Sequence, residues 1–330
     1  MDASMPSERE FLQRIKGLVH SIEGAVLGFD EDASDIPVRN GQNVIINVDT
    51  FVGKTDWLPE MTAAQAGRKT AVMTISDIAA KGGLPTAAML SLCVPKDYPV
   101  EEAEDIVRGF SQYCMKTGIS FIGGDLGVAE DVVMTGVGIG FAPANGIITR
   151  SGAKPNDILA ATGDFGLTTV AFEHLLNGKE VNDQLKSDAL AAVLNPHIHH
   201  EFVHALAKEG AVNASMDSSD GLAITLHTMA RMSGVSFVIE RLPIPTEVMK
   251  FARNNYMMEF NFVMRGGEEF ILLLSIPEDK WETAYEIAQK QKVPLYSIGY
   301  ATTGKGVVYE TEEGYIDIPE SGYDNVKGWD

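Results

Sequence analysis

The chain has 330 residues, 45% of them hydrophobic, and its 46 acidic against 26 basic residues give a formal net charge of −20. A chain of this length exceeds the roughly 100–200 residues usual for one domain, so two packed cores are expected. The negative charge repels phosphate backbones and anionic membrane surfaces, which argues against nucleic acid and membranes as partners. A solvated acidic surface is the simpler explanation for much of this charge.

The cysteine content and the first residues predict a soluble cytoplasmic protein. Cys93 and Cys114 are the two cysteines, and both lie in segments typical of packed strand or helix, so neither a disulfide framework nor a Cys-x-x-Cys metal site is expected. The opening MDASMPSERE lacks the basic and apolar regions of a signal peptide. The longest apolar stretch, Val132 to Ala142, is too short for a membrane helix.

The first half of the chain predicts one α/β unit with the order strand, helix, strand, helix, strand, strand. The alternating segment NVIINVD predicts a half-buried strand ending at Asp49. A capping box at Thr62 and Gln65 begins a helix that Gly82 and Gly83 end. The strand TAAMLSLCVP, a helix from about Pro99 to Gly118, and the strands ISFIGGD and DVVMTGVGIGF follow.

A segment rich in turn formers, APANGIITRSGAKPND, separates this unit from a second one. Beyond it the sequence predicts a strand in DILAATG, a helix after Gly166, a strand in VNASMD, a helix in SDGLAITLHTMARMSG, and strands in VSFVIE and EEFILLLSI. The fold class is therefore α/β with two domains, 1–145 and 146–330, the second an α/β sandwich.

Several acidic residues follow strands or lie beside glycines, which is unusual for surface acids. If they converge, their mutual repulsion requires cations among them, and Mg²⁺ prefers oxygen ligands of this kind. The alternative is that each acid caps a helix or forms a turn, as Asp217 could before Ser218, Ser219 and Asp220. The candidates are Glu31, Asp32, Asp49, Asp77, Asp125, Asp217 and Asp220.

Asp77 is the hardest of these acids to explain as a cap. It lies between Ile75 and Ile78 in a helix dominated by alanine, valine and isoleucine. A lone buried carboxylate costs several kcal/mol unless it is paired or binds a metal.

Phosphate binding is also indicated, although no standard motif carries it. FIGGDLG and TGDFG supply glycines, and Arg68, Lys69, Arg150 and Lys154 supply cations. The P-loop, the Rossmann fingerprint and the combined protein-kinase signatures are absent from the sequence. His200 and His204, four apart on a predicted helix, could ligate zinc, but no third ligand has suitable spacing.

In their order along the chain, these motifs resemble the thiamine-monophosphate kinases of the aminoimidazole-ribotide-synthetase-like ATP-binding superfamily. The resemblance runs from about Leu27 to Tyr323. It is carried by GFDEDASDI, VDTFVGKTDW, AGRKTAVMTISDIAAKGGLP, FIGGDLG, TRSGAKPNDILAATGDFG, MDSSDGL, RLPIP, GGEEFILLL and GYDNV.

The resemblance implies a role for each matching residue. Magnesium would be bound by Glu31, Asp32, Asp49, Asp77, Asp125, Asp217 and Asp220. ATP would contact Gly124, Asp125, Arg150 and Ser219, with Asp220 and Arg150 the catalytic residues, and thiamine monophosphate would contact Asp56, Glu268 and Tyr323.

The implied reaction is direct transfer of the ATP γ-phosphate to thiamine monophosphate, in a homodimer whose N-terminal sheets join and whose ATP site uses both subunits. Three departures concern the substrate: Asp56 replaces a usual histidine, GGDL replaces GGDT, and GYDNV lacks the histidine of GFDHF. Two alternatives stay open. One is a synthetase or dehydratase on the same scaffold, resembling selenophosphate synthetase, the hydrogenase-maturation dehydratases or aminoimidazole ribotide synthetase. The other is a nucleotide-binding regulatory protein without turnover.

Overall fold

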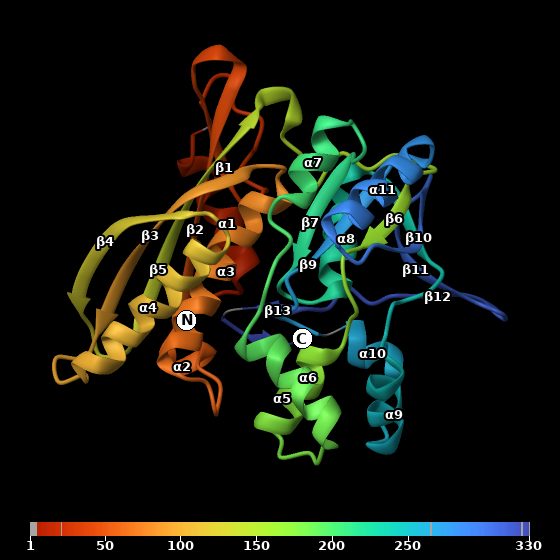
Figure 1. The fold of residues 1–330 in the computed structure, drawn as a ribbon. Helices are drawn as coiled ribbons and strands as arrows, with labels where there is room; N and C mark the ends of the chain where they lie inside the picture. The colour runs from red at the N-terminus through yellow and green to blue at the C-terminus, as the bar shows by residue number, and fades with distance from the viewer. Residues whose placement is uncertain (1–4, 21, 265, 325, 330) are drawn as a thin grey trace.

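The computed structural model describes residues 5–20, 22–264, 266–324 and 326–329. Within them the chain forms two large mixed sheets covered by helices, as Figure 1 shows, and a small two-stranded sheet near the C-terminus. The first half contains α1 Glu8–Ile15, β1 Ser34–Pro37, β2 Gln42–Val52, α2 Gly53–Asp56, α3 Ala63–Ala80, β3 Leu84–Val94, α4 Val100–Lys116, β4 Ser120–Val128 and β5 Val133–Pro143, with short 3-10 turns at Lys16–Leu18, Arg39–Gly41 and Ala144–Gly146.

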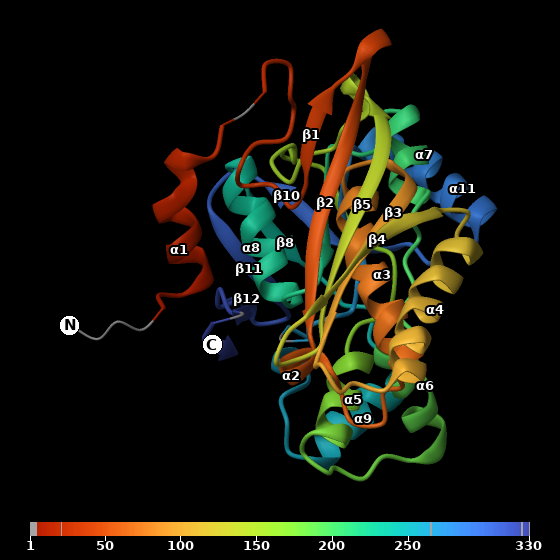
Figure 2. The same cartoon turned by 90° about the vertical axis from the view of Figure 1, so that its left-hand side faces the viewer.

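The N-terminal sheet has five strands in the order β1-β2-β5-β3-β4, antiparallel except for the parallel pair β3 and β4. Both long helices, α3 and α4, lie along the same side of this sheet (Figure 2). The predicted order of strands and helices is confirmed. The expected strand end at Asp49 is wrong, because β2 continues to Val52 in register with β5.

The second half contains β6 Ile158–Ala161, α5 Leu167–Leu175, α6 Asp183–Leu194, α7 Phe202–Lys208, β7 Ala214–Ser218, α8 Leu222–Ser233, β8 Ser236–Ile239, α9 Thr246–Asn254, α10 Glu259–Met264, β9 Ile271–Ile276, α11 Trp281–Gln291, β10 Tyr296–Thr302, β11 Gly306–Thr311, β12 Gly314–Asp317, β13 Tyr323–Asp324 and β14 Gly328–Trp329. Its main sheet has the order β12-β11-β8-β10-β6-β9-β7. The α/β class with two sheets agrees with the prediction.

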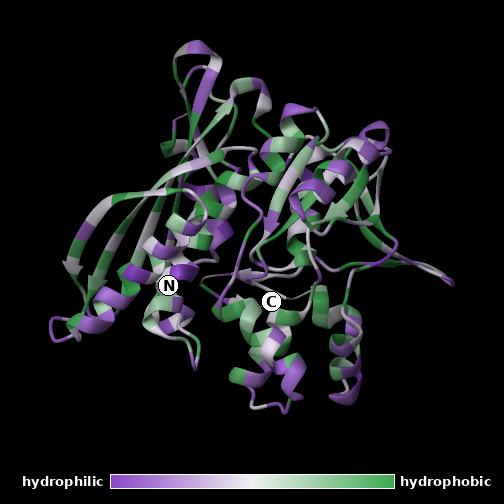
Figure 3. Ribbon diagram, in the orientation of Figure 1, coloured by the Kyte–Doolittle hydropathy of each residue, from purple (hydrophilic) through white to green (hydrophobic). Residues whose placement is uncertain are grey.

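Sequence patterns explain the helix boundaries and the packed faces. Helix α3 begins with the predicted capping box, in which the Thr62 hydroxyl accepts from Gln65 N and the Gln65 side chain accepts from Thr62 N. Helix α4 is amphipathic, which Figure 3 shows as alternating hydrophilic and hydrophobic segments, and it buries Ile106, Phe110 and Tyr113. Helices α5, α6 and α9 from the second half share one hydrophobic core with α3 and α4.

Two glycines bring α3 and α4 into close contact. A Cβ atom on Gly67 would lie 1.9 Å from the Ile106 oxygen, and one on Gly109 would lie 1.8 Å from the Ala64 oxygen. We therefore expect Gly109→Ala to lower the free energy of unfolding by about 1–3 kcal/mol or more, because the helices must separate. Urea denaturation measures this, with exposed Gln112→Ala on the same helix as control. An unchanged midpoint for Gly109→Ala would contradict the packing described.

Candidate functional site

A cavity of about 810 Å³ lies where β2 and α3 of the first half meet α5, the start of α8 and the loop before β9. Its wall brings together side chains from distant parts of the sequence, from Glu8 to Tyr323. Nine predicted site residues line it: Asp32, Asp49, Asp56, Asp77, Asp217, Ser219, Asp220, Glu268 and Tyr323.

Strand β2 supplies Asp49 to this cavity. Alternation along the strand buries Ile45, Asn47 and Phe51, so Asp49 shares their side of the sheet, toward α3. Its carboxylate accepts a hydrogen bond from Thr50 N at 2.8 Å. Burial raises the pKa of Asp49 to about 6, and the neighbouring carboxylates of Asp217 and Asp56 add to the rise.

Asp77, Asp217 and Asp32 form the centre of the acidic group. One oxygen from each lies within 4.8 Å of the others, an arrangement that could hold a metal ion. Burial and the nearby Asp217 and Asp49 raise the pKa of Asp77 well above its usual value. The Asp217 carboxylate at the end of β7 is almost fully buried and accepts from the Ser76 hydroxyl at 2.5 Å. Asp77 thus faces this cavity, close to the other two aspartates.

Asp220 occupies the turn between β7 and α8. The turn depends on Gly221, whose φ of 113° is unfavourable for other residues, and the backbone carbonyl oxygen of Asp220 accepts from Tyr323 N at 2.9 Å. Burial raises the pKa of Asp220 to about 7, with contributions from Glu8 and Asp217. The tight turn therefore aims a carboxylate at the acidic group instead of capping α8, which has no side-chain cap.

Glu31 and Arg150 lie beside the cavity without lining it. The Arg150 guanidinium forms an ion pair with Asp32, and Arg150 N donates to both Glu31 oxygens at 3.2 Å. The Lys81 Nζ lies 2.6 Å from Glu31 Oε2 and 3.3 Å from Asp32 Oδ2. Glu31 and Asp32, the early acidic motif, are thus paired with the side chains of Lys81 and Arg150.

Gly124 and Asp125 lie away from this cavity. Both are exposed on β4, the edge strand, three strands away from β2 in the sheet order. No other predicted cofactor-binding residue within the described chain is as remote, because Ser219 lines the cavity and Arg150 pairs with Asp32.

Glu268 lies in a strained loop that faces the cavity. Glu268 and Phe270 have φ values of 58° and 52°, and their backbone N–H groups donate to the Ser219 and Ser218 oxygens. The Glu268 carboxylate pairs with the Lys69 Nζ at 2.5 Å. The ammonium also donates to the backbone carbonyl oxygen of Asp56 at 3.3 Å and lies over the Phe51 ring. Buried Lys69 thus links the two predicted substrate residues.

Sequence reasoning missed several residues of this site. Lys69 is predicted to bind phosphate but pairs with Glu268. Lys81, which pairs with Glu31, is not among the predicted site residues. Both occur in the same apolar helical segment as Asp77, so the same signal could have found them. Burial raises the pKa of Glu269 to about 8, although its carboxylate accepts from Gly166 N at 2.5 Å. Apolar lining residues had no sequence signal: Leu58, Met73, Phe172, Leu176, Met257, Met258 and Phe262.

The prediction that His200 and His204 lie on one helix is wrong. His200 precedes α7, which begins at Phe202, so only His204 lies on that helix. His204 Nδ1 is 2.8 Å from the Gly82 oxygen. Over the described ranges, the group able to hold a metal ion consists of aspartates and includes no histidine.

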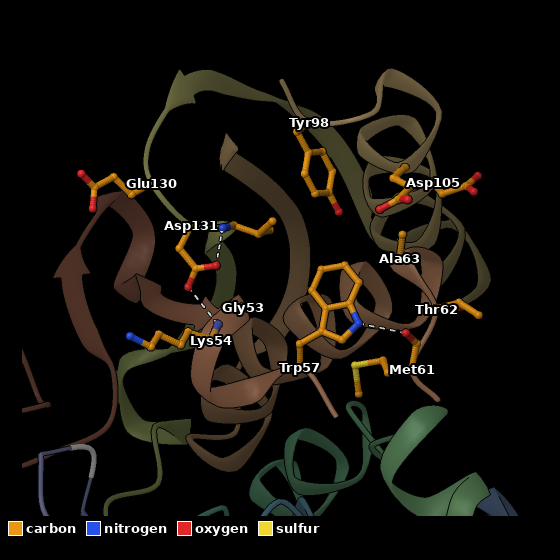
Figure 4. Close-up of a pocket in the computed structure, with 12 residues that line it drawn as sticks. Gly53, Lys54, Trp57, Met61, Thr62, Ala63, Tyr98, Asp105, Glu130 and Asp131 are labelled. Carbon is orange, nitrogen blue, oxygen red and sulfur yellow. Dashed lines mark hydrogen bonds between the residues drawn. The ribbon is translucent and has the colours of Figure 1, made fainter. Parts of the chain in front are cut away.

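A second cavity, of about 900 Å³, is lined by residues of α2, the start of α3, the start of α4 and the loop before β5 (Figure 4). Trp57 and Tyr98 line it, and Trp57 Nε1 donates to the Met61 oxygen at 2.9 Å. Its Asp131 carboxylate accepts from Lys54 N and Val132 N, both at 2.8 Å. None of the predicted site residues lines this cavity, and its Asp131 carboxylate binds the backbone of the local turn.

The raised pKa of Asp220 predicts a pH dependence for the metal-free protein. The folded value of about 7 exceeds the usual 3.8, so the folded state binds more protons between these values and stability falls as pH rises through them. Between pH 4 and 8, the wild type should lose up to about 4 kcal/mol relative to Asp220→Asn. Urea denaturation in a chelator tests this, with exposed Asp188→Asn as control. Parallel stability curves for wild type and Asp220→Asn would refute it.

Within the described residues no helix combines the length and apolar content required to cross a bilayer.

Two protein-family domains match consecutive parts of the chain. Residues 30–142 match the N-terminal domain of the AIR synthase related proteins, and residues 154–311 match the C-terminal domain. These two domains in succession define the class of the protein.

Individual relatives make the assignment more specific. The chain is 33% identical over 295 residues to a thiamine-monophosphate kinase of Nitrosopumilus maritimus, covering 89% of this chain and 93% of the relative. It also superimposes on tt0281 of Thermus thermophilus with a TM-score of 0.83 at 29% identity, covering 92% of this chain and 95% of that one. The chain belongs to the thiamine-monophosphate kinase family. AaThiL complexed with AMPPCP and TMP shares the fold, with a TM-score of 0.84 at 23% identity and coverage of 98% and 100%.

Proposed function

We propose that this chain transfers the γ-phosphate of ATP to the phosphate of thiamine monophosphate, giving thiamine diphosphate and ADP. The observation that carries the proposal is the single cavity in which nine residues from distant segments converge. Its wall combines carboxylates with an apolar surface from Phe172, Leu176 and Phe262. A charged phosphate end and a ring-binding end are what a nucleotide and a thiamine phosphate require together.

Magnesium fits the acidic group, because Asp32, Asp77 and Asp217 offer hard oxygen ligands close together. We propose that these three hold it with Asp49 and Asp220. When bound, magnesium neutralises the charge between two anionic substrates. Asp125 and Glu31 are the weaker candidates, since Asp125 lies on the distant strand β4 and Glu31 is engaged by Lys81.

The side chains of this protein would act mainly by position and charge. The acceptor is already a phosphate oxygen, so in-line transfer needs no strong protein base. Arg150 is nine-tenths enclosed, and its Nε has no hydrogen-bond partner among the described residues, so it can donate to a phosphate oxygen. Ser219 and Asp220, at the start of α8, would meet the nucleotide phosphates. These roles assign Asp220 and Arg150 as catalytic residues.

The acceptor end would be formed by Asp56, Glu268 and Tyr323. Asp56 has its Oδ2 held by Val52 N at 2.7 Å, and Glu268 is held by Lys69. Fixed carboxylates beside apolar side chains suit the positively charged ring system of thiamine. Asp56 would therefore favour the cationic acceptor by charge.

We also propose a homodimer formed through the N-terminal sheet. Strands β2 and β4 expose apolar side chains, including Val48 (60%), Leu126 (71%) and Val128 (73%). Covering this face would remove exposed apolar surface and would let Gly124 and Asp125 reach the partner's ATP site. Sedimentation equilibrium is expected to give about twice the chain mass of 35.7 kDa. A fully active monomer would refute this arrangement.

The domain bounds and the cellular location are proposed together with the function. We propose 1–145 and 146–330 as the domains, supported by the separation of the strands into two sheets, one from 34–143 and one from 158–317. A cytoplasmic location suits an enzyme that uses ATP as a substrate.

An acceptor screen tests the function. Purified protein with ATP and Mg²⁺ is incubated with thiamine monophosphate, thiamine, selenide, a carbamoyl donor or a ribotide precursor, and ³¹P NMR follows the products. We expect thiamine diphosphate and ADP in equal amounts with thiamine monophosphate alone. Turnover with another acceptor instead would support a relative on the same scaffold, and ATP binding without ADP formation would support a regulatory protein.

A further inference from the structure

Lys81 lies next to Asp32 of the acidic group, where a lysine is unexpected. It follows Ala80 at the end of α3, and its backbone N–H donates to the backbone carbonyl oxygen of Asp77 at 3.1 Å. Its side chain is fully buried. Burying an ammonium is costly unless carboxylates surround it, so the position requires specific partners.

The partners of Lys81 are the two acids of the early motif. Its Nζ lies 2.6 Å from Glu31 Oε2 and 3.3 Å from Asp32 Oδ2. The Glu31 carboxylate is 4% exposed and also accepts from Arg150 N through both oxygens. With these contacts, Glu31 has little capacity left for a metal ion, and it does not belong to the group formed by Asp32 and its neighbours.

Charge divides the acidic residues into two sets. Glu31 and Asp32 carry two negative charges, which the side chains of Lys81 and Arg150 balance. The second set has no such balance. It has four members: Asp49, Asp77, Asp217 and Asp220. Among the residues that the structure describes, none of the four forms an ion pair within 4.0 Å.

We propose that the Lys81 ammonium is a resident cation that occupies the position between Glu31 and Asp32, so that no divalent ion binds there. Lys81 is then a positioning residue that directs one Asp32 oxygen toward Asp77 and Asp217. The proposal rests on the proposed metal site and deepens it. The divalent ions then bind the unbalanced set together with that one Asp32 oxygen, and Glu31 and Asp32 keep their positions when chelators remove those ions.

The test compares Lys81→Met, which keeps the length of the side chain and removes the charge, with the double variant Lys81→Met/Glu31→Gln. Two readouts need neither ATP nor an acceptor: the number of Mn²⁺ ions bound per chain, by electron paramagnetic resonance, and the rise in Tm when Mg²⁺ replaces EDTA. A failed acceptor screen therefore leaves this test intact.

Lys81→Met should bind about one more Mn²⁺ than the wild type and show a larger Mg²⁺-dependent rise in Tm, because an ion now takes the place of the ammonium. The double variant should return to the wild-type values for both. Equal Mn²⁺ numbers and equal Tm shifts in Lys81→Met and the wild type would overturn the proposal. If Lys81→Met failed to fold with Mg²⁺ or Mn²⁺ while the double variant folded, no ion could replace the ammonium, which would overturn it too.

Discussion

Asp217→Asn is expected to lower kcat for thiamine diphosphate formation by about 10²- to 10³-fold at saturating Mg²⁺, the usual effect of removing one preorganised charge from a phosphoryl-transfer site. Asp217 is nearly inaccessible to solvent and shares the metal-binding group with Asp32 and Asp77. It also raises the pKa values of Asp49, Asp77 and Asp220, so its charge affects the whole group. Steady-state kinetics measure the effect.

Stability separates this role from a structural one. In a chelator, Asp217→Asn should be at least as stable as the wild type, because one repelling charge is removed. Exposed Asp188→Asn is the matched control and should retain full activity. If Asp217→Asn kept wild-type kcat at limiting Mg²⁺, Asp217 would have no part in the reaction.

Lys69→Met is expected to destabilise the protein by about 2–3 kcal/mol and to raise KM for thiamine monophosphate more than it changes kcat. Lys69 is 1% exposed and pairs with Glu268, which is 31% exposed, so part of the full cost of breaking a buried pair is relieved by solvent. Glu268 would lose its fixed orientation beside the acceptor. Urea denaturation and initial rates provide the two measurements.

A double-mutant cycle shows whether the pair itself is responsible. Lys69→Met/Glu268→Gln removes both charges and should recover most of the lost stability but not the acceptor KM. Additive losses in stability would show that Lys69 and Glu268 do not interact in solution.

Much of the N-terminal half could be predicted from local sequence signals. The capping box at Thr62 and the glycines after Ala80 determine where α3 begins and ends, and both act within a few residues. The second half was predicted less completely, because α6, α9 and α11 and the strands β10 to β12 carry weaker signals and are stabilised by tertiary packing.

The acidic group could be predicted because its aspartates follow strands, lie beside glycines or, like Asp77, lie in an apolar helix, where burying a lone carboxylate is unfavourable. The counter-ions could not, since Lys81 meets Glu31 across 50 positions of sequence and Lys69 meets Glu268 across many more. Sequence spacing likewise does not show that β4 lies at the sheet edge, away from the cavity that the other acids share. The pairing of strands determines that separation.

We propose that aspartates distant in sequence bind the divalent ions that hold a triphosphate. A crystal structure with AMPPCP and Mn²⁺, with diffraction data recorded at the manganese edge, tests it most directly. We expect anomalous density in contact with oxygens of Asp32, Asp77 and Asp217 and with the phosphates. Manganese bound to the nucleotide alone, with these carboxylates out of reach, would contradict it.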